Sequence, residues 1–220
     1  MDTADSQKTR DQQTQGRPHE PPEGVLAALG STRRPIVFGH VAPDADCLGS
    51  AMALVCVLRK RGIDAVFGIP DGAGPKKLRF MFELVSDCPR TSVMPDDRDL
   101  VITVDTASET RVNFDPRPSL SAGPRSLNID HHITNTDFAT VNWVDSHASS
   151  TCELIAHLID AMGTSPNPAV ASLLFAGIHG DTAGFSLPAT TADALETAAA
   201  LIRCGAEVSL IGERLFRSQE

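Results

Sequence analysis

The sequence predicts an α/β fold with a doubly wound, mainly parallel sheet of five strands flanked by helices. Two observations lead to this prediction. Short apolar runs of strand length alternate with longer segments of helical length through most of the chain. Aspartate and histidine residues gather just after several of the short runs, where open parallel sheets carry their ligands.

Five short runs have the length and composition of strands. The first, residues 35–39, is a short apolar run, which is consistent with a buried strand. The expected strands are residues 35–39, 64–69, 99–106, 126–129 and 139–144.

Seven longer segments predict helices. The second of them is apolar and ends at Gly62, a residue that commonly terminates helices. The expected helices are residues 25–29, 49–61, 78–85, 149–162, 168–179, 191–204 and 206–216, of which the first is a short turn. Strands and helices that alternate in this way favour parallel pairing of the strands.

The chain divides into a tail and one domain. Residues 1–23 are polar and cannot bury enough apolar surface to offset the entropy of ordering, so we expect a disordered tail. Residues 24–220 carry the strand and helix pattern, and their length suits a single domain.

Composition and charge restrict the partners. The formal net charge of −9 argues against long duplex nucleic acid, whose affinity depends on many Lys and Arg contacts to phosphates. With nine Phe, one Trp and no Tyr, the chain has few aromatic side chains on which the bases of single-stranded nucleic acid could stack. A small phosphorylated ligand stays compatible with the acidic chain, because a pocket with bound metal cations attracts phosphate locally.

The cysteine pattern and hydropathy bear on the compartment. Five cysteines are widely spaced without a Cys-x-x-Cys motif, which disfavours a disulfide framework and a cysteine-based zinc site. No apolar run approaches the ~18 residues of a membrane-spanning helix, and the start of the chain lacks the apolar core of a signal peptide. We therefore expect a cytoplasmic protein with reduced thiols and no membrane partner.

Four places along the chain supply candidate metal ligands. Each lies at the end of a predicted strand or helix, and a lone aspartate at such a place is most often a turn former or a helix cap. The joint pattern on one edge of the sheet favours metal binding instead, and the mixture of carboxylate and imidazole suits Mn²⁺, Fe²⁺, Co²⁺ or Zn²⁺. The candidates are His40, Asp44, Asp46, Asp105, Asp130, His131, His132 and Asp181.

Other polar residues have weaker signals. Ser149, Ser150 and Thr151 open a predicted helix, where they could cap it or where free N–H groups could hold a phosphate, and both readings stay open. Three histidines, His147, His157 and His179, and the basic cluster Lys76, Lys77 and Arg79 are each more often surface or packing residues, although a phosphate contact is conceivable for the basic cluster.

The candidate ligands stand in motifs that resemble those of the DHH phosphoesterases. The segment His40–Ser50 is similar to the first motif, Val104–Thr106 to the second, and Asn128–His132 to the third, which names the family. The segment Gly177–Phe185 resembles the fourth motif. The segment Asp145–Glu153 is similar to the helix start found in the nanoRNase and pAp phosphatase branch.

The resemblance implies a site with two divalent metal ions, with Mn²⁺ expected and Mg²⁺, Co²⁺ or Fe²⁺ as alternatives. It implies that Asp105 bridges the ions and that a metal-bridging water attacks the phosphate. One ion would be held by His40, Asp44 and Asp105, and the other by Asp46, Asp105, His131 and Asp181. His132 would face the substrate phosphate, and Asp130 would orient the histidine pair.

The resemblance also implies a function and its alternatives. The leading expectation is hydrolysis of very short oligonucleotides or 3′-phosphoadenosine 5′-phosphate (pAp). A cyclic-dinucleotide phosphodiesterase, a pyrophosphatase or polyphosphatase, or a non-catalytic nucleotide-binding module are alternatives, with a homodimer left open. The Gly-rich motif and basic residues of the family's second, substrate-gripping domain are absent from this sequence, so we expect weak or promiscuous activity.

Overall fold

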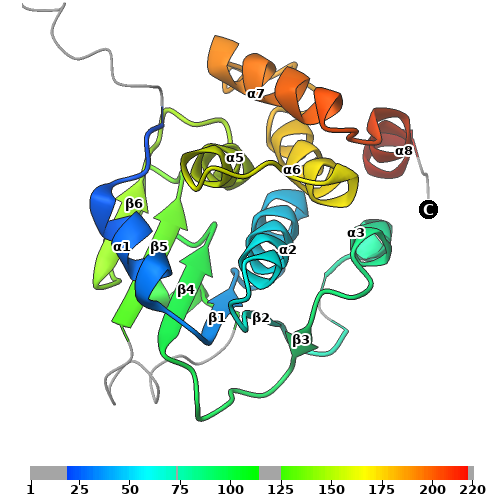
Figure 1. Cartoon of the computed structure of the whole chain (residues 1–220). Helices are drawn as coiled ribbons and strands as arrows, with labels where there is room; N and C mark the ends of the chain where they lie inside the picture. The colour runs from blue at the N-terminus through cyan, green and yellow to red at the C-terminus, as the bar shows by residue number, and fades with distance from the viewer. Residues whose placement is uncertain (1–18, 73, 114–124, 218–220) are drawn as a thin grey trace, which may run out of the picture.

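The computed structural model describes residues 19–72, 74–113 and 125–217, and its centre is a six-stranded sheet (Figure 1). The spatial order of the strands is β3-β2-β1-β4-β5-β6, and every neighbouring pair is parallel. The strands are β1 (Pro35–Phe38), β2 (Val66–Gly68), β3 (Arg90–Thr91), β4 (Leu100–Val104), β5 (Arg125–Asp130) and β6 (Val141–Val144).

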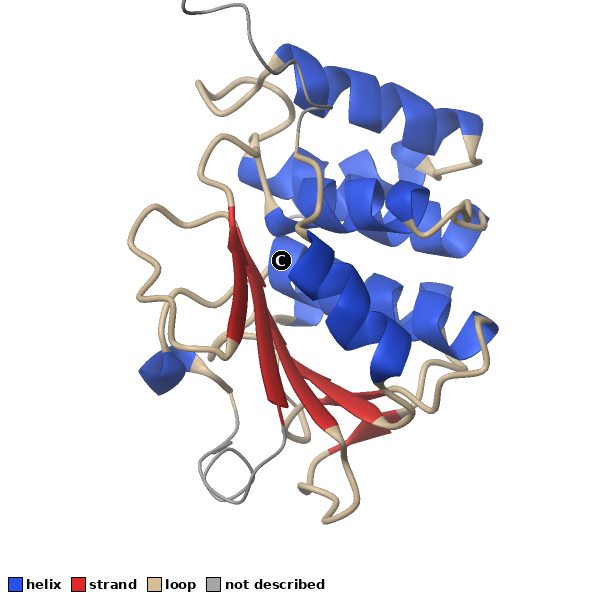
Figure 2. Ribbon diagram, turned by 60° about the vertical axis from the view of Figure 1, so that its left-hand side comes forward, coloured by secondary structure: helices blue, strands red, loops and turns tan. Residues whose placement is uncertain are grey.

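Seven described α-helices share one hydrophobic core with one face of the sheet, and Figure 2 shows them gathered largely on that side. Val37, Ile102 and Ile129 supply the sheet side of this core, and all three are fully buried. The helices are α1 (Glu23–Ser31), α2 (Ala45–Lys60), α3 (Arg79–Leu84), α5 (Thr151–Ala161), α6 (Pro168–Asp181), α7 (Ala192–Arg203) and α8 (Val208–Gly212).

The other face of the sheet carries a smaller apolar cluster. Ile36, Phe38 and Val101 point to it from the two central strands, and Val112 and Phe138 cover it from the loops after β4 and β5. The strand order is that of a doubly wound sheet. In the described residues, however, the segments that follow β4 and β5 cover this face with loops and the short 3₁₀ helix Glu109–Arg111 in place of α-helices.

The predicted fold class is confirmed, and the sheet has one more strand than the five predicted. The missing prediction is β3, whose two residues pair with Phe67 and Gly68 at the edge of the sheet. Two residues are too few to show a periodic pattern, so no sequence signal marks this strand. Helix α2 begins at Ala45, four residues before the predicted start, because the side chain of Asp44 accepts a hydrogen bond from the N–H of Cys47 and caps it.

The predicted tail, residues 1–23, lies mostly outside the described residues. Within its described part, α1 starts at Glu23, and the ring of His19 packs against the domain with its Nδ1 2.7 Å from Asp145 Oδ2. Among the described residues, no helix is both long and apolar enough to cross a membrane.

Candidate metal centre

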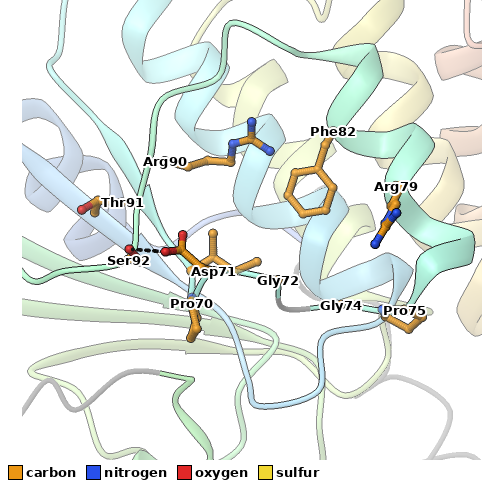
Figure 3. Close-up of a pocket in the computed structure, with 11 residues that line it drawn as sticks. Pro70, Asp71, Gly72, Gly74, Pro75, Arg79, Phe82, Arg90, Thr91 and Ser92 are labelled. Atoms are coloured by element: carbon orange, nitrogen blue, oxygen red, sulfur yellow. Dashed lines mark hydrogen bonds between the residues drawn. The ribbon is translucent and has the colours of Figure 1, made fainter.

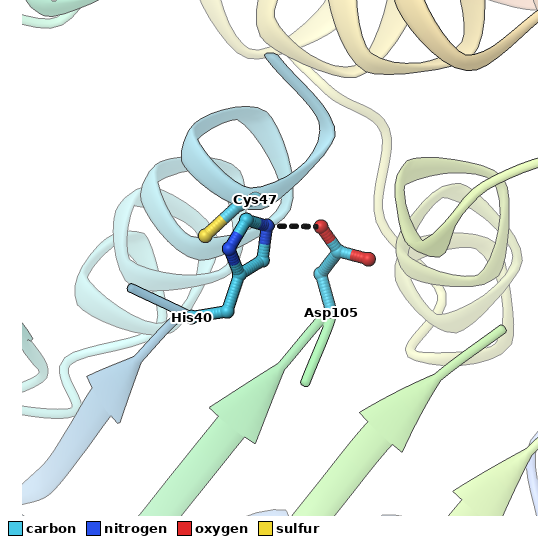
Figure 4. A group of neighbouring side chains, drawn as sticks. All are labelled: His40, Cys47 and Asp105. Carbon is cyan, nitrogen blue, oxygen red and sulfur yellow. Dashed lines mark ion pairs between the residues drawn. The ribbon is translucent and has the colours of Figure 1, made fainter. Parts of the chain in front are cut away.

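The candidate ligands meet where the strand order reverses. β1 and β4 are neighbours in the sheet, but the chain leaves β1 toward β2 on one side and leaves β4 toward β5 on the other. Loops that diverge in this way leave a crevice at the carboxyl ends of the two strands, where open α/β sheets bind ligands. His40 follows β1 and Asp105 follows β4, so both residues lie at this crevice (Figure 4).

His40 is buried and faces two carboxylates. Its Nδ1 lies 2.7 Å from the carbonyl oxygen of Val41, which fixes the ring. Its Nε2 lies 3.3 Å from Asp105 Oδ2 and 3.8 Å from the exposed Asp44. Burial alone would lower the pKa of His40, but these two carboxylates raise it. The free ring nitrogen is therefore aimed at the carboxylates, as a ligand of a shared cation would be.

Asp105 is the centre of the group. Its carboxylate lies within 3.6 Å of His131 Nε2 and of His132 Nδ1 through Oδ1, while Oδ2 faces His40. The residue is buried and has a φ of 52°, which is uncommon outside glycine and costs on the order of 1 kcal/mol or more. The N–H of Asp105 donates to the carbonyl of Ile129 on β5, which holds the backbone in this position.

A second group of donors lies beside the first. His131 follows β5, and its Nε2 is 3.3 Å from Asp181 Oδ2 and 3.9 Å from Asp46 Oδ2. Asp181 is the last residue of α6, and Asp46 is in the first turn of α2. Gly177 on α6 allows this approach, because a Cβ there would lie 2.8 Å from Asp46 Oδ1 and 2.3 Å from Cys152 Sγ.

The start of α5 holds Asp46 in place. The N–H groups of Thr151 and Cys152 donate to the two oxygens of Asp46 at 2.7 and 2.8 Å, and Thr151 Oγ1 donates to Asp105 Oδ1 at 3.3 Å. A helix N-terminus favours a carboxylate at this position. These N–H groups therefore already hold a carboxylate, which weakens the expectation that they bind phosphate.

The two serines before α5 make capping contacts. Ser150 is the N-cap, and its Oγ accepts the N–H of Glu153 at 3.1 Å. The backbone N–H and the hydroxyl of Ser149 both donate to Glu153 Oε2 at 2.7 Å. Both serines are buried, so of the two readings of this segment the contacts favour capping.

Asp130 and His132 form a separate pair at the mouth of the crevice. His132 Nδ1 lies 2.7 Å from Asp130 Oδ1, and Asn135 Nδ2 donates to Asp130 Oδ2 at 2.6 Å. Burial favours a raised pKa for Asp130, but these hydrogen bonds lower it, and the contact with Asp130 raises the pKa of His132. The side chain of His132 is 43% exposed, so its other ring nitrogen is accessible to a ligand.

The electrostatics of the cluster favour a cation. Burial, followed by repulsion from Asp105 and Asp44, raises the pKa of Asp181 to about 8. Burial and the carboxylates of Asp105, Asp181 and Asp44 also raise the pKa of Asp46, although the N–H of Cys152 stabilises its charge. Four carboxylates that repel one another around two imidazoles have the donor chemistry of a site for hard or borderline divalent cations. The residues present therefore fit a metal centre.

Cys47 is an additional neighbour of this centre. Together with His40 and Asp105 it forms a group of potential ligand atoms within 4.8 Å of one another (Figure 4). Burial raises the pKa of the Cys47 thiol to about 12, so it stays protonated and packs beside His40. Cys47 stands in the first motif, seven residues after His40, but it is not among the ligands that the resemblance implies.

Three other described histidines have surroundings apart from the carboxylates of the metal centre. His147 is exposed beside Asp145, and the Nε2 of His157 on α5 lies 3.4 Å from the Thr197 hydroxyl. The ring of His179 packs among the rings of Phe175, Phe185 and Phe216.

With this geometry in place, the comparison with known families is decisive. Residues 34–178 match the DHH family, N-terminal domain. This chain belongs to the DHH family. The match includes every candidate ligand except Asp181, which lies three residues beyond its end.

Relatives and solved structures agree with this assignment. The chain is 32% identical, over 84% of its length, to the bifunctional oligoribonuclease and PAP phosphatase NrnA of Bacillus subtilis. It spans 57% of that relative and a similar share of other curated relatives. An exopolyphosphatase-related protein from Bacteroides fragilis has the same fold, with a TM-score of 0.79 and 22% identity over 90% of this chain and 60% of that one. RecJ of Thermus thermophilus, solved with Mn²⁺, shares the fold at a TM-score of 0.53 and 20% identity over 90% of this chain and 33% of that one.

Proposed function

We propose that the chain is the catalytic part of a metal-dependent phosphoesterase that hydrolyses short oligonucleotides or pAp. One observation carries the proposal: three other carboxylates, of which only that of Asp44 is exposed, and two imidazoles gather around Asp105 at the switch point of the sheet. Membership of the DHH family supports a phosphoesterase activity, because a relative that is 32% identical to this chain is named as an oligoribonuclease and PAP phosphatase.

Two groups of side chains would hold two ions. His40, Asp44 and Asp105 form one group, and Asp46, Asp105, His131 and Asp181 form the other. Bound divalent cations would supply Lewis-acid stabilisation of the phosphate and an activated water. We favour Mn²⁺, and the Mn²⁺ complex of the fold relative RecJ is compatible with this choice. The donor set itself also accepts Mg²⁺, Co²⁺ or Fe²⁺.

His132, oriented by Asp130, would supply the proton that the leaving group needs. Asp130 is fixed by Asn135 and keeps its charge, so it holds His132 through Nδ1 and would leave Nε2 for the substrate. The raised pKa of His132 allows the ring to carry a proton near neutral pH. Such a ring can donate a hydrogen bond to a phosphate oxygen and give a proton to the leaving alkoxide.

The substrate assignment follows the relatives' names. Both NrnA relatives are described as acting on oligoribonucleotides and PAP, so we assign this class to the chain ahead of cyclic dinucleotides and pyrophosphate. The acidic surface, at a net charge of −9, is consistent with a small substrate.

The test is a substrate panel with metal titration. The purified chain is incubated with pAp, a diribonucleotide, cyclic di-AMP and pyrophosphate at increasing Mn²⁺, with an EDTA control and an Asp105→Asn control. We expect turnover of pAp or the dinucleotide that rises with Mn²⁺ and is lost in both controls. Preference for pyrophosphate or cyclic di-AMP would redirect the substrate, and binding without turnover would make the chain a nucleotide-binding module.

A further inference from the structure

A cavity of about 650 Å³ lies at the ends of β2 and β3, and Figure 3 shows the residues that line it. Ile69 and Pro70 line it just after β2, and Thr91 and Ser92 line it at the end of β3. Because all six strands are parallel, the ends of β2 and β3 face the same side as the ends of β1 and β4. The cavity is within the usual size range for small-ligand sites.

The cavity adjoins the loop that carries the candidate ligands. Gly74 is part of its wall, and a Cβ placed on Gly74 would lie 3.9 Å from the ring of Pro43 and 3.7 Å from Leu48. Pro43 directly precedes Asp44. The cavity therefore borders the loop that carries His40 and Asp44.

Two arginines give the cavity its chemistry. The guanidinium of Arg90 lies over the ring of Phe82, 5.0 Å from its centre, and Arg79 borders the same ring from the start of α3 (Figure 3). Arg34, Arg59 and Arg98 all pair with aspartates elsewhere on the surface. Within the described part of the chain, Arg79 and Arg90 have no such pair.

The acidic residue on the wall leaves both arginines available. Asp71 accepts a hydrogen bond from the Ser92 hydroxyl at 3.2 Å, and the Thr91 hydroxyl donates to the carbonyl of Val93 at 2.8 Å. Arg79 and Arg90 are exposed and offer planar forks of N–H donors, which match the oxygens of a phosphate. In a chain of net charge −9, two unpaired guanidinium groups beside an aromatic ring are a local site for an anion.

We propose that this cavity binds a second phosphate of the substrate, with Arg79 and Arg90 on the phosphate and Phe82 against its nucleoside. The substrate class is then a short nucleotide with at least two phosphate groups, one cleaved at the metal centre and one held in the cavity. This inference rests on the proposed function for its kinetic test, but the binding test below is independent of it.

The kinetic test compares two substrates in the intact chain with Mn²⁺. pAp carries two phosphates, whereas bis(p-nitrophenyl) phosphate carries one and cannot fill both places. In Arg79→Ala and Arg90→Ala we expect KM for pAp to rise by about tenfold or more, because each variant removes a charge-assisted hydrogen bond to the phosphate. Hydrolysis of bis(p-nitrophenyl) phosphate should be unchanged.

The matched control is Lys77→Ala. Lys77 is exposed on the 3₁₀ helix just before Arg79 and does not line the cavity, so this variant removes the same charge nearby. It should leave KM for pAp within about twofold, since a single exposed charge contributes little. Unchanged KM in both arginine variants, an equal rise in Lys77→Ala, or equal loss on both substrates would overturn the proposal.

Binding without metal separates this proposal from the catalytic one. Calorimetric titration of pAp in EDTA should give binding to the wild type that weakens about tenfold or more in each arginine variant and not in Lys77→Ala. If the chain never turns over a substrate but shows this binding pattern, the proposed function fails and the cavity assignment stands. If turnover occurs and the arginine variants bind and turn over pAp like the wild type, the cavity assignment fails.

Discussion

The two ends of strand β4 carry aspartates in opposite situations. Asp99 directly precedes Leu100 at one end, and Asp105 directly follows Val104 at the other. Asp99 accepts hydrogen bonds from the Thr32 hydroxyl and from the backbone N–H groups of Arg33 and Arg34. These donors outweigh the effect of burial and lower the pKa of Asp99. Asp99 is a satisfied structural carboxylate.

Asp105 has neighbours of its own charge. Asp46 and Asp181 share its surroundings, and repulsion from Asp105 contributes to the raised pKa of both. Its backbone has a φ of 52°, in the left-handed region. The end of β4 at Asp99 therefore stabilises the fold, whereas the arrangement at Asp105 lowers its stability. Unfavourable arrangements of this kind concentrate at functional sites. The contrast makes the two aspartates a matched pair for experiment.

The largest effect should come from Asp105→Asn. Removing the charge shared by both donor groups should lower the affinity for Mn²⁺ strongly. The loss should exceed the ~10–100-fold that is typical when a residue hydrogen-bonded to a metal ligand is removed. In EDTA the melting temperature should stay equal or rise, because repulsion falls and asparagine tolerates a positive φ. Calorimetry and thermal denaturation measure the two quantities. Retained affinity together with lower stability would make Asp105 a structural residue like Asp99.

Asp181→Asn should have a smaller and different effect. Asp181 contacts His131 but belongs to one donor group only, so one ion should be weakened while the other remains. In a manganese titration, the number of ions bound per Asp181→Asn chain should fall from two toward one. Asp105→Asn, in contrast, should lose both ions. Identical, minor losses in the two variants would argue against a bridging role for Asp105.

The smallest effect is expected for Asp99→Asn, and it should fall on stability alone. The amide nitrogen of the asparagine cannot accept a hydrogen bond, so one of the N–H groups that now donate to Asp99 would lose its acceptor. The free energy of unfolding at pH 7 should therefore drop by about 1 kcal/mol, and the affinity for Mn²⁺ should not change. Because the folded-state pKa lies below the ordinary 3.8, Asp99 stabilises the fold above pH 3.8 and loses this contribution as the pH falls through its folded value.

Urea denaturation over a pH series tests this sign. The stability difference between the wild type and Asp99→Asn should be full at pH 5–7 and should shrink below about pH 3.8. A difference that grows in acid, or a loss of Mn²⁺ binding, would contradict the assignment of Asp99 as purely structural.

The sequence was sufficient for the parts of the fold that local pattern determines. The apolar runs of β1 and β4 and the ligands just after them follow from strand length and the geometry of parallel sheets. The two residues of β3 show no pattern, and their pairing depends on the tertiary fold. The packing of His19 against Asp145, 126 positions away, lay beyond any local signal.

The support of the site was less predictable than its ligands. Asp46 receives the N–H groups of Thr151 and Cys152 from more than 100 positions away, so capping signals at the start of α5 could not show which carboxylate is held there. The cavity with Arg79 and Arg90 likewise unites residues of two elements, although the basic cluster that contains Arg79 was visible in the sequence.

If the carboxylates around Asp105 hold two cations that act together, the number of ions bound per chain shows it. Calorimetry of the wild-type chain with Mn²⁺ measures this number, and electron paramagnetic resonance of the loaded protein shows whether the ions are close. We predict two equivalents per chain and a spin-coupled signal, since paired ions in such sites lie roughly 3.5–4 Å apart. No binding, or one isolated ion that Asp105→Asn leaves in place, would contradict it.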